Sequence, residues 1–90
     1  MLGLVTSRQF HKDIKRIKKQ GKKTEKLKEI ISLLANEIAL PIGKRDHKLT
    51  GTYNHHRECH IAPDWLLIYR TTPTELILER TGSHSELFRQ

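Results

Sequence analysis

The sequence has little cysteine and no long apolar run, and each shortage excludes a class of protein. Cys59 is the only cysteine, so no intramolecular disulfide can form and a reducing compartment is expected. The longest strictly apolar run is WLLIY at 65–69, far short of the ~20 residues of a membrane-spanning helix. The opening MLGLVTS lacks the features of a secretory signal. A cytoplasmic protein is therefore expected.

Acidic residues are also scarce relative to basic ones. The chain has 10 Asp and Glu against 17 Lys and Arg, a formal net charge of +7 and a pI near 9.9. Ten of the seventeen basic residues lie between Arg8 and Lys28, opposed there only by Asp13 and Glu25. This imbalance favours a surface that follows a phosphate backbone, although lysine is also common on solvated helix faces. A polyanionic partner is expected.

Ninety residues, 36% of them hydrophobic, predict one domain over 1–90 with a lean core and a large working surface. Residues 2–5 are predicted as a strand. TSRQ at 6–9 fits a capping box that starts a helix, and Gly21 can end it. A second helix is predicted from Thr24 to a point before Pro41. Its apolar stripe comprises Leu27, Ile30, Ile31, Leu34 and Ile38.

From Thr52 onward the pattern changes to strands separated by turn residues. We expect a strand to start at 52–53 and further strands at 58–62, 65–71 and 75–81. The fold class is therefore α+β: two N-terminal antiparallel helices packed on one face of a small, mostly antiparallel twisted sheet, with the other face open.

Alternation along the strands assigns some side chains to faces. Cys59 and Ile61 should face the helices, which leaves Glu58 and His60 on the open face. In ELILER at 75–80 both faces carry apolar residues, so the direction of Arg80 stays undecided.

The run HHRECHIAPDW at 55–65 raises the possibility of a metal site. Its spacing does not suit one, because Cys59 and His60 point to opposite faces of a strand. No second CxxC or HxxxH completes a tetrahedral set. We therefore expect no metal and no other cofactor.

Acid–base chemistry is the second interpretation of these residues. Histidine exchanges protons near neutral pH, and an arginine stabilises charge on a phosphate, so such residues on one open face could cleave RNA without a metal. Trp65 could stack on a base or could belong to the core, and isolated histidines are often surface residues. The candidates are His47, His60, Asp64, Arg80 and His84.

Three segments together carry a resemblance to a known family. KRDHKLTG (44–51), RECHIAPDWLLIYR (57–70) and ERTGSHSELF (79–88) resemble the YafQ branch of the RelE-type toxins of bacterial toxin–antitoxin pairs. The resemblance extends over nearly the whole chain and implies the RelE-like fold.

The resemblance implies a ribosome-dependent messenger-RNA interferase that cuts the messenger in the decoding site without a metal. His84 would be the general acid. His47, His60 and Asp64 would share activation and orientation of the ribose 2′-hydroxyl, and Arg80 would stabilise the phosphate. Trp65 and Phe88 would help to position the RNA.

The implied partners are messenger RNA on the translating ribosome, ribosomal RNA and an acidic cognate antitoxin, with no membrane. Two alternatives stay open: a ParE-like inhibitor of DNA gyrase without nuclease activity, and a basic nucleic-acid-binding module. The sequence departs from the family pattern in two places. His55 and His56 are additions that could contact phosphates or have no role, and Lys48 stands where proline is common.

Overall fold

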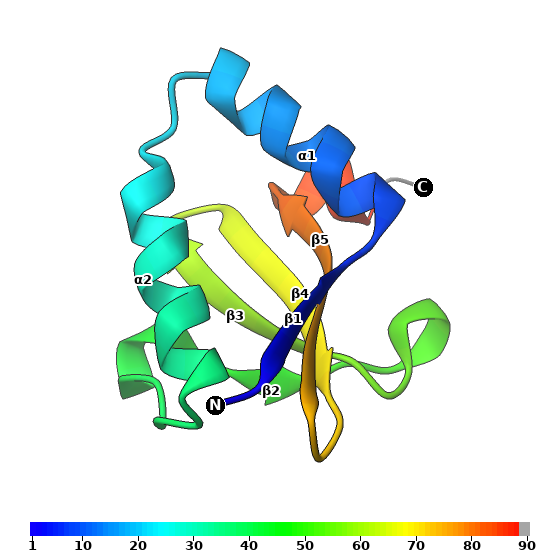
Figure 1. Cartoon of the computed structure of the whole chain (residues 1–90). Coiled ribbons are helices and arrows are strands. Elements are labelled where there is room, and N and C mark those ends of the chain that lie inside the picture. The colour runs from blue at the N-terminus through cyan, green and yellow to red at the C-terminus, as the bar shows by residue number, and fades with distance from the viewer. Residues whose placement is uncertain (89–90) are drawn as a thin grey trace.

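A computed structural model describes residues 1–88, and Figure 1 shows how their elements are arranged. The helices are α1 (Arg8–Lys19), α2 (Thr24–Ala35) and α3 (His84–Leu87), with 3-10 turns η1 (Ile42–Lys44) and η2 (Gly51–Tyr53). The strands are β1 (Gly3–Thr6), β2 (His47–Lys48), β3 (Arg57–Ala62), β4 (Trp65–Thr71) and β5 (Glu75–Gly82).

The five strands form one sheet in the order β1-β5-β4-β3-β2. All neighbouring pairs are antiparallel except β1 with β5, which are parallel. The prediction of an α+β fold with a mostly antiparallel sheet is confirmed. The parallel pair arises because the chain starts at one edge of the sheet and returns beside that edge only at β5.

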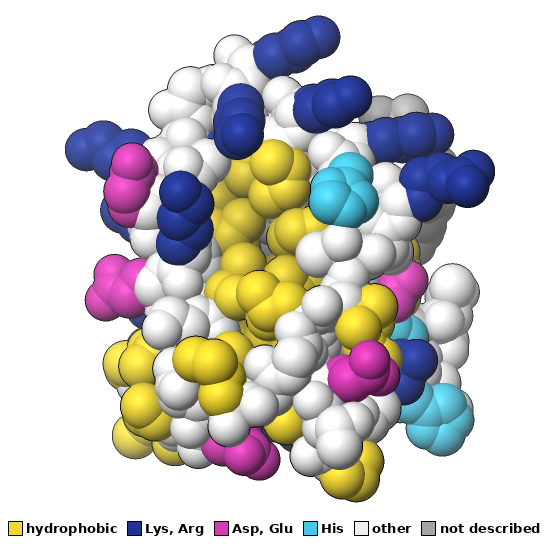
Figure 2. All heavy atoms as spheres, in the orientation of Figure 1, with side chains coloured by type: hydrophobic (Ala, Val, Ile, Leu, Met, Phe, Trp, Pro, Cys, Tyr) yellow, Lys and Arg dark blue, Asp and Glu magenta, His cyan; other side chains and the backbone are white. Residues whose placement is uncertain are grey.

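The helices α1 and α2 cover one face of the sheet and enclose the larger core. They diverge from their connecting loop as the arms of an open V, rather than lying side by side (Figure 1). Figure 2 shows apolar side chains gathered between the arms and Lys and Arg side chains around them. Cys59 and Ile61 belong to this core, as their strand parity predicted, and burial raises the pKa of Cys59 to about 12.

The opposite face is not fully open, which corrects one expectation. Leu66 and Ile68 of β4 are both 0% exposed and form a second, smaller cluster with Leu87 of α3. Leu49 and Tyr53 pack against this cluster. The short helix α3 and the segment 49–53 therefore cover part of the second face. What stays accessible is the end of the sheet near β2 and β3.

The cap of α1 and the last residue of the α2 stripe differ from the predictions. Ser7, rather than Thr6, caps α1, because its side chain accepts a hydrogen bond from the Phe10 amide. Helix α2 ends before Pro41, as predicted; its last residue is Ala35, because Glu37 takes a left-handed conformation with φ of 58°. Ile38 then lies outside the helix and is 53% exposed, so its place in the apolar stripe was predicted wrongly.

The chain between the helices and β3 also differs from the prediction. Residues 52–53 belong to the 3-10 turn η2 and do not start a strand. The two-residue strand β2 precedes that turn and pairs with the start of β3; its shortness left no periodic pattern to find. Among the described residues, no helix has the length and apolar character needed to cross a membrane.

Candidate active site

Glu58 joins two of the predicted histidines. His47 on β2 lies directly opposite Glu58 on β3, and its Nε2 is 3.5 Å from Glu58 Oε1. The Nε2 of His60, two residues further along β3, is 3.8 Å from the same oxygen. All three side chains point away from the helices, as parity predicted for Glu58 and His60. Glu58 is only 4% exposed.

The backbone sets the tautomer of His47. Its Nδ1 lies 2.6 Å from the carbonyl oxygen of Arg45, and a carbonyl can only accept a hydrogen bond. Nδ1 therefore carries a proton, and Nε2 is the atom directed at Glu58. A protonated His47 would form an ion pair there, while a neutral His47 would present a lone pair to the carboxylate.

A second histidine–carboxylate pair lies at the end of the β3–β4 hairpin. Asp64 occupies the two-residue turn between these strands in a left-handed conformation, φ 53°, which aspartate tolerates. Its Oδ1 accepts hydrogen bonds from the His84 backbone N–H at 3.0 Å and from His84 Nδ1 at 2.9 Å. These bonds, the backbone one first, hold the pKa of Asp64 below its usual value.

The imidazole rings of the two pairs lie close together, and the two histidines differ in exposure. The ring centroids of His60 and His84 are 5.9 Å apart. The His60 side chain is 21% exposed and that of His84 57%. Burial lowers the pKa of His60 below its ordinary 6.5, which favours the neutral ring that can accept a proton. Asp64 accepts a hydrogen bond from Nδ1 of His84, so Nε2 is the ring atom left for a substrate.

A β-bulge decides the direction of Arg80, which the sequence left open. Tyr69 pairs with Leu78 while the preceding Ile68 pairs with Arg80, so Glu79 is the extra residue on β5. Leu78 lies in the core under the helices, whereas Ile68 lies in the cluster on the opposite face. Because directly opposite residues share a face, the bulge turns Arg80 to the face of Glu58.

Asp13 of α1 holds Arg80 in place, and sequence reasoning missed this role. Asp13 is 0% exposed. It accepts bonds from Arg80 Nε at 2.7 Å and Nη2 at 3.1 Å, from Arg16 Nη1 at 2.8 Å, and from the Thr81 amide at 3.1 Å. Burial alone would raise the pKa of Asp13, but these bonds outweigh it and lower the pKa.

A signal for Asp13 was present in the sequence. It stands between Phe10 and Ile17 on the apolar face of a lysine-rich helix, where a lone carboxylate needs a buried partner. Glu58 was placed on the correct face but was not chosen as a site residue.

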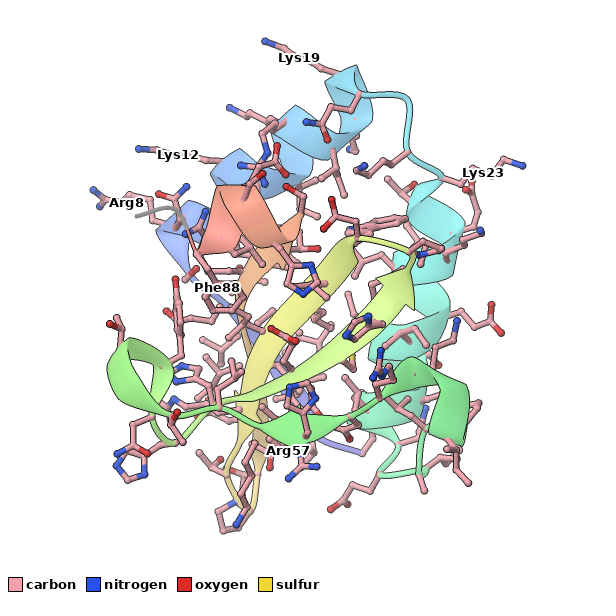
Figure 3. All side chains as sticks on the ribbon, turned by 180° about the vertical axis from the view of Figure 1, so that it is seen from behind. Arg8, Lys12, Lys19, Lys23, Arg57 and Phe88 are labelled. Atoms are coloured by element: carbon pink, nitrogen blue, oxygen red, sulfur yellow. The ribbon has the colours of Figure 1, made fainter. Side chains whose placement is uncertain are left out.

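The two aromatic candidates occupy different positions. Phe88 is 38% exposed and lies beside α3 (Figure 3), 6.4 Å from His84 between ring centroids. Trp65 is 3% exposed; it donates from Nε1 to Thr81 Oγ1 at 2.9 Å, and Lys22 Nζ lies 5.9 Å from its ring centroid. The expected stacking of Trp65 on a base is therefore corrected to a packing role, because its side chain is buried in the larger core.

Glu58, His60 and His84 could also hold a metal ion. One ligand atom from each lies within 4.8 Å of the other two, and imidazole and carboxylate groups suit several divalent metals. The sequence did not predict this set because its members come from β3 and from the start of α3.

The basic residues of the helices are mostly solvent-exposed. Arg8, Lys12, Lys19 and Lys23 point outward from α1 and from the loop that leads to α2 (Figure 3). Arg16 is the exception, since it pairs with Asp13.

The sequence and the fold of this chain match those of known proteins. Over residues 2–89 the chain matches the family described as bacterial toxin of type II toxin–antitoxin system, YafQ. This chain belongs to the YafQ toxin family. It is 43% identical over 83 residues to the mRNA interferase toxin YafQ of Escherichia coli (strain K12), covering 91% of this chain and 90% of the relative.

Two solved structures resemble this member of the YafQ family closely. One is a crystal structure of the E. coli DinJ–YafQ toxin–antitoxin complex, with a TM-score of 0.89, 41% identity and 97% of each chain covered. The other is a metal-bound toxin from Helicobacter pylori, with a TM-score of 0.91 and 42% identity, covering 98% of this chain and all of that one. The resemblance inferred from the three motif segments is thereby confirmed.

Proposed function

We propose that this chain is a messenger-RNA interferase that cuts RNA by attack of the ribose 2′-hydroxyl on the adjacent phosphate. The observation that carries the proposal is the meeting of two histidine–carboxylate pairs of unequal exposure, His60–Glu58 and His84–Asp64. One pair suits proton removal and the other proton donation, which are the two transfers that this reaction needs.

The base is the pair formed by His60 and Glu58. His60 takes the proton of the 2′-hydroxyl, the 2′-oxygen then bonds to phosphorus, and the bond from phosphorus to the 5′-oxygen breaks. The lowered pKa of His60 favours the neutral form that can accept the proton. Glu58 stabilises the resulting imidazolium, and His47 on its other side orients the carboxylate when the Nε2 of His47 carries a proton.

The acid is His84, which protonates the departing 5′-oxygen from Nε2. Asp64 orients the ring through Nδ1, so its role is to position the acid rather than to activate the hydroxyl. Arg80 supplies positive charge for the phosphate, with its guanidinium held by Asp13. Phe88, beside His84, offers an exposed ring on which a base can stack.

The partners follow from this activity and from the relatives. The substrate is messenger RNA in the decoding site of a translating ribosome, where ribosomal RNA adds phosphates for the exposed lysines of α1 and α2. A cognate antitoxin is inferred because the similar E. coli protein is found in a DinJ–YafQ complex. A surplus of Asp and Glu residues on that antitoxin would complement the +7 charge of this chain.

The test is cleavage of a messenger on reconstituted translating ribosomes, with naked RNA beside it, by the wild type and by His84→Ala. We expect decoding-site cleavage by the wild type and a loss of about 100-fold or more in the variant. Asn36→Ala, an exposed change far from the site in sequence, is the matched control. No cleavage by folded wild type would contradict the proposal, and gyrase inhibition by the same preparation would favour the ParE-like alternative.

A further inference from the structure

A cavity of about 370 Å³ lies beside the catalytic residues and contains none of them. Its charged and titratable lining consists of Lys48, His55, His56, Arg57 and Arg70. No Asp or Glu of residues 1–88 lines it. A cavity lined by three permanent cations and no carboxylate attracts an anion.

The cations differ in how far they are already paired. Arg57 Nε lies 2.9 Å from Asp46 Oδ1, and His56 Nε2 lies 3.3 Å from Glu79 Oε2. Within residues 1–88, neither Lys48 nor Arg70 forms an ion pair or a side-chain hydrogen bond. Lys48 and Arg70 are therefore the groups with unused charge.

The cavity adjoins the catalytic cluster at the next register of the strands. Lys48 follows His47 on β2, and Arg57 precedes Glu58 on β3; the register pairs each with its counterpart. Alternation turns Lys48 and Arg57 away from the face of His47 and Glu58, and Arg57 is paired with Tyr69 of the larger core. Arg70 lies two residues beyond Ile68, the residue opposite Glu58 on β4, a step of roughly 7 Å. Figure 3 shows Arg57 at the lower edge of the sheet. Arg70 therefore shares the face of Glu58, and RNA lying on the catalytic residues would reach the cavity at Arg70.

We propose that this cavity binds a backbone phosphate of RNA adjacent to the site of cleavage. The inference rests on the proposed function, because it takes the catalytic cluster as the place of the scissile phosphate. The lysine acts as a point charge and the arginine as a planar donor, a combination that recognises phosphate without reading the base. His55 and His56, which the catalytic proposal leaves without a role, line the same cavity.

The phosphate could belong to the messenger or to ribosomal RNA, and one experiment separates these sources. Ribosomes are programmed with messengers that carry 2′-deoxynucleotides in the decoding site, so binding is measured without cleavage. One messenger ends at the decoding-site codon and the other continues beyond it. The proteins are the wild type, Lys48→Ala/Arg70→Ala, and the charge-preserving Lys48→Arg/Arg70→Lys.

We expect the double alanine variant to bind about tenfold or more weakly, and the charge-preserving variant to bind like the wild type. A loss seen only with the continued messenger assigns the phosphate to the messenger, and an equal loss with both assigns it to ribosomal RNA. Unchanged affinity, or the same loss in the charge-preserving variant, would overturn the proposal. Thermal melting of each variant checks that it is folded.

A separate measurement keeps the cavity testable if the proposed function fails. If the wild type neither binds nor cleaves on ribosomes, the proposed function is wrong, and the same proteins are titrated with fluorescent oligouridylate over a range of salt. Loss of contact with this one phosphate should reduce the slope of log affinity against log salt by roughly 0.7. An unchanged slope in the double alanine variant would overturn the phosphate site as well.

Discussion

The two faces of the sheet differ in how much apolar surface they bury and in the charged groups they carry. The face under α1 and α2 buries a large apolar cluster that includes Leu67 and Tyr69 of β4. The opposite face buries only a small cluster that includes Leu66 and Ile68, and it carries Glu58 and the candidate histidines. Because most of the apolar packing lies on one face, the other can hold charged groups at short distances, where they influence one another's proton affinity.

Neighbouring residues on β4 test this division most strongly. Leu67 and Ile68 are both 0% exposed, but they face opposite clusters. We expect Leu67→Ala to cost about 4 kcal/mol of unfolding free energy. Ile68→Ala should cost about 2 kcal/mol, because the smaller cluster can relax around the gap. Urea unfolding measures both, and equal losses would contradict a division into a major and a minor core.

Asp13 joins the two faces, so its removal should affect both stability and activity. We expect Asp13→Asn to cost about 3 kcal/mol of stability, because Arg80 and Arg16 lose their buried charge partner. It should also lower the rate of cleavage at saturating ribosomes, since Arg80 loses its orientation. Glu25→Gln on the exposed surface is the matched control. A stable variant with unchanged kcat would contradict the positioning role.

The effect of Asp13 on stability should depend on pH in a defined direction. Its pKa is lowered in the folded protein from 3.8, so the folded state binds fewer protons than the unfolded chain near that pH. The contribution is then complete above pH 3.8 and is lost as the pH falls through the folded pKa. The difference in unfolding free energy between wild type and Asp13→Asn should shrink in that range.

The loss of cleavage rate at acidic pH (the acid limb of the pH profile) should reflect the protonation of His60. Because burial lowers its pKa below 6.5, we expect the midpoint of the fall in single-turnover cleavage to lie below pH 6.5. The charge of Glu58 opposes this shift, so Glu58→Gln should move the limb to still lower pH. A limb that does not move in this variant would assign the base to another group.

Metal removal should have the smallest effect. The histidine–carboxylate pairs can supply both proton transfers, so dialysis against a chelator should leave the cleavage rate unchanged. Added Zn²⁺ should inhibit, because Glu58, His60 and His84 together could bind it and would then be unavailable to the substrate. Restoration of activity by stoichiometric zinc after chelation would instead show a metal requirement.

Local patterns predicted much of the fold and several features of the site. Strand β4 was predicted with its observed bounds, because an apolar run between turn residues is a signal within the run itself. The faces of Cys59 and Glu58 followed from alternation. The strand β2 and the 3-10 turn η2 were missed, since two or three residues carry no periodicity.

The sequence by itself determined the two long helices and the longer strands, the strand faces of β3, the charge of the helices and the motifs that indicate the family. Only the tertiary structure decided which way Arg80 points, that Asp13 accepts its hydrogen bonds, that Asp64 is bonded to His84, and that Trp65 is buried. The reason is physical: a bulge is defined by pairing with another strand, and Asp13 meets Arg80 across 67 positions of chain. Such contacts depend on how distant elements pack and leave no periodic mark in either segment alone.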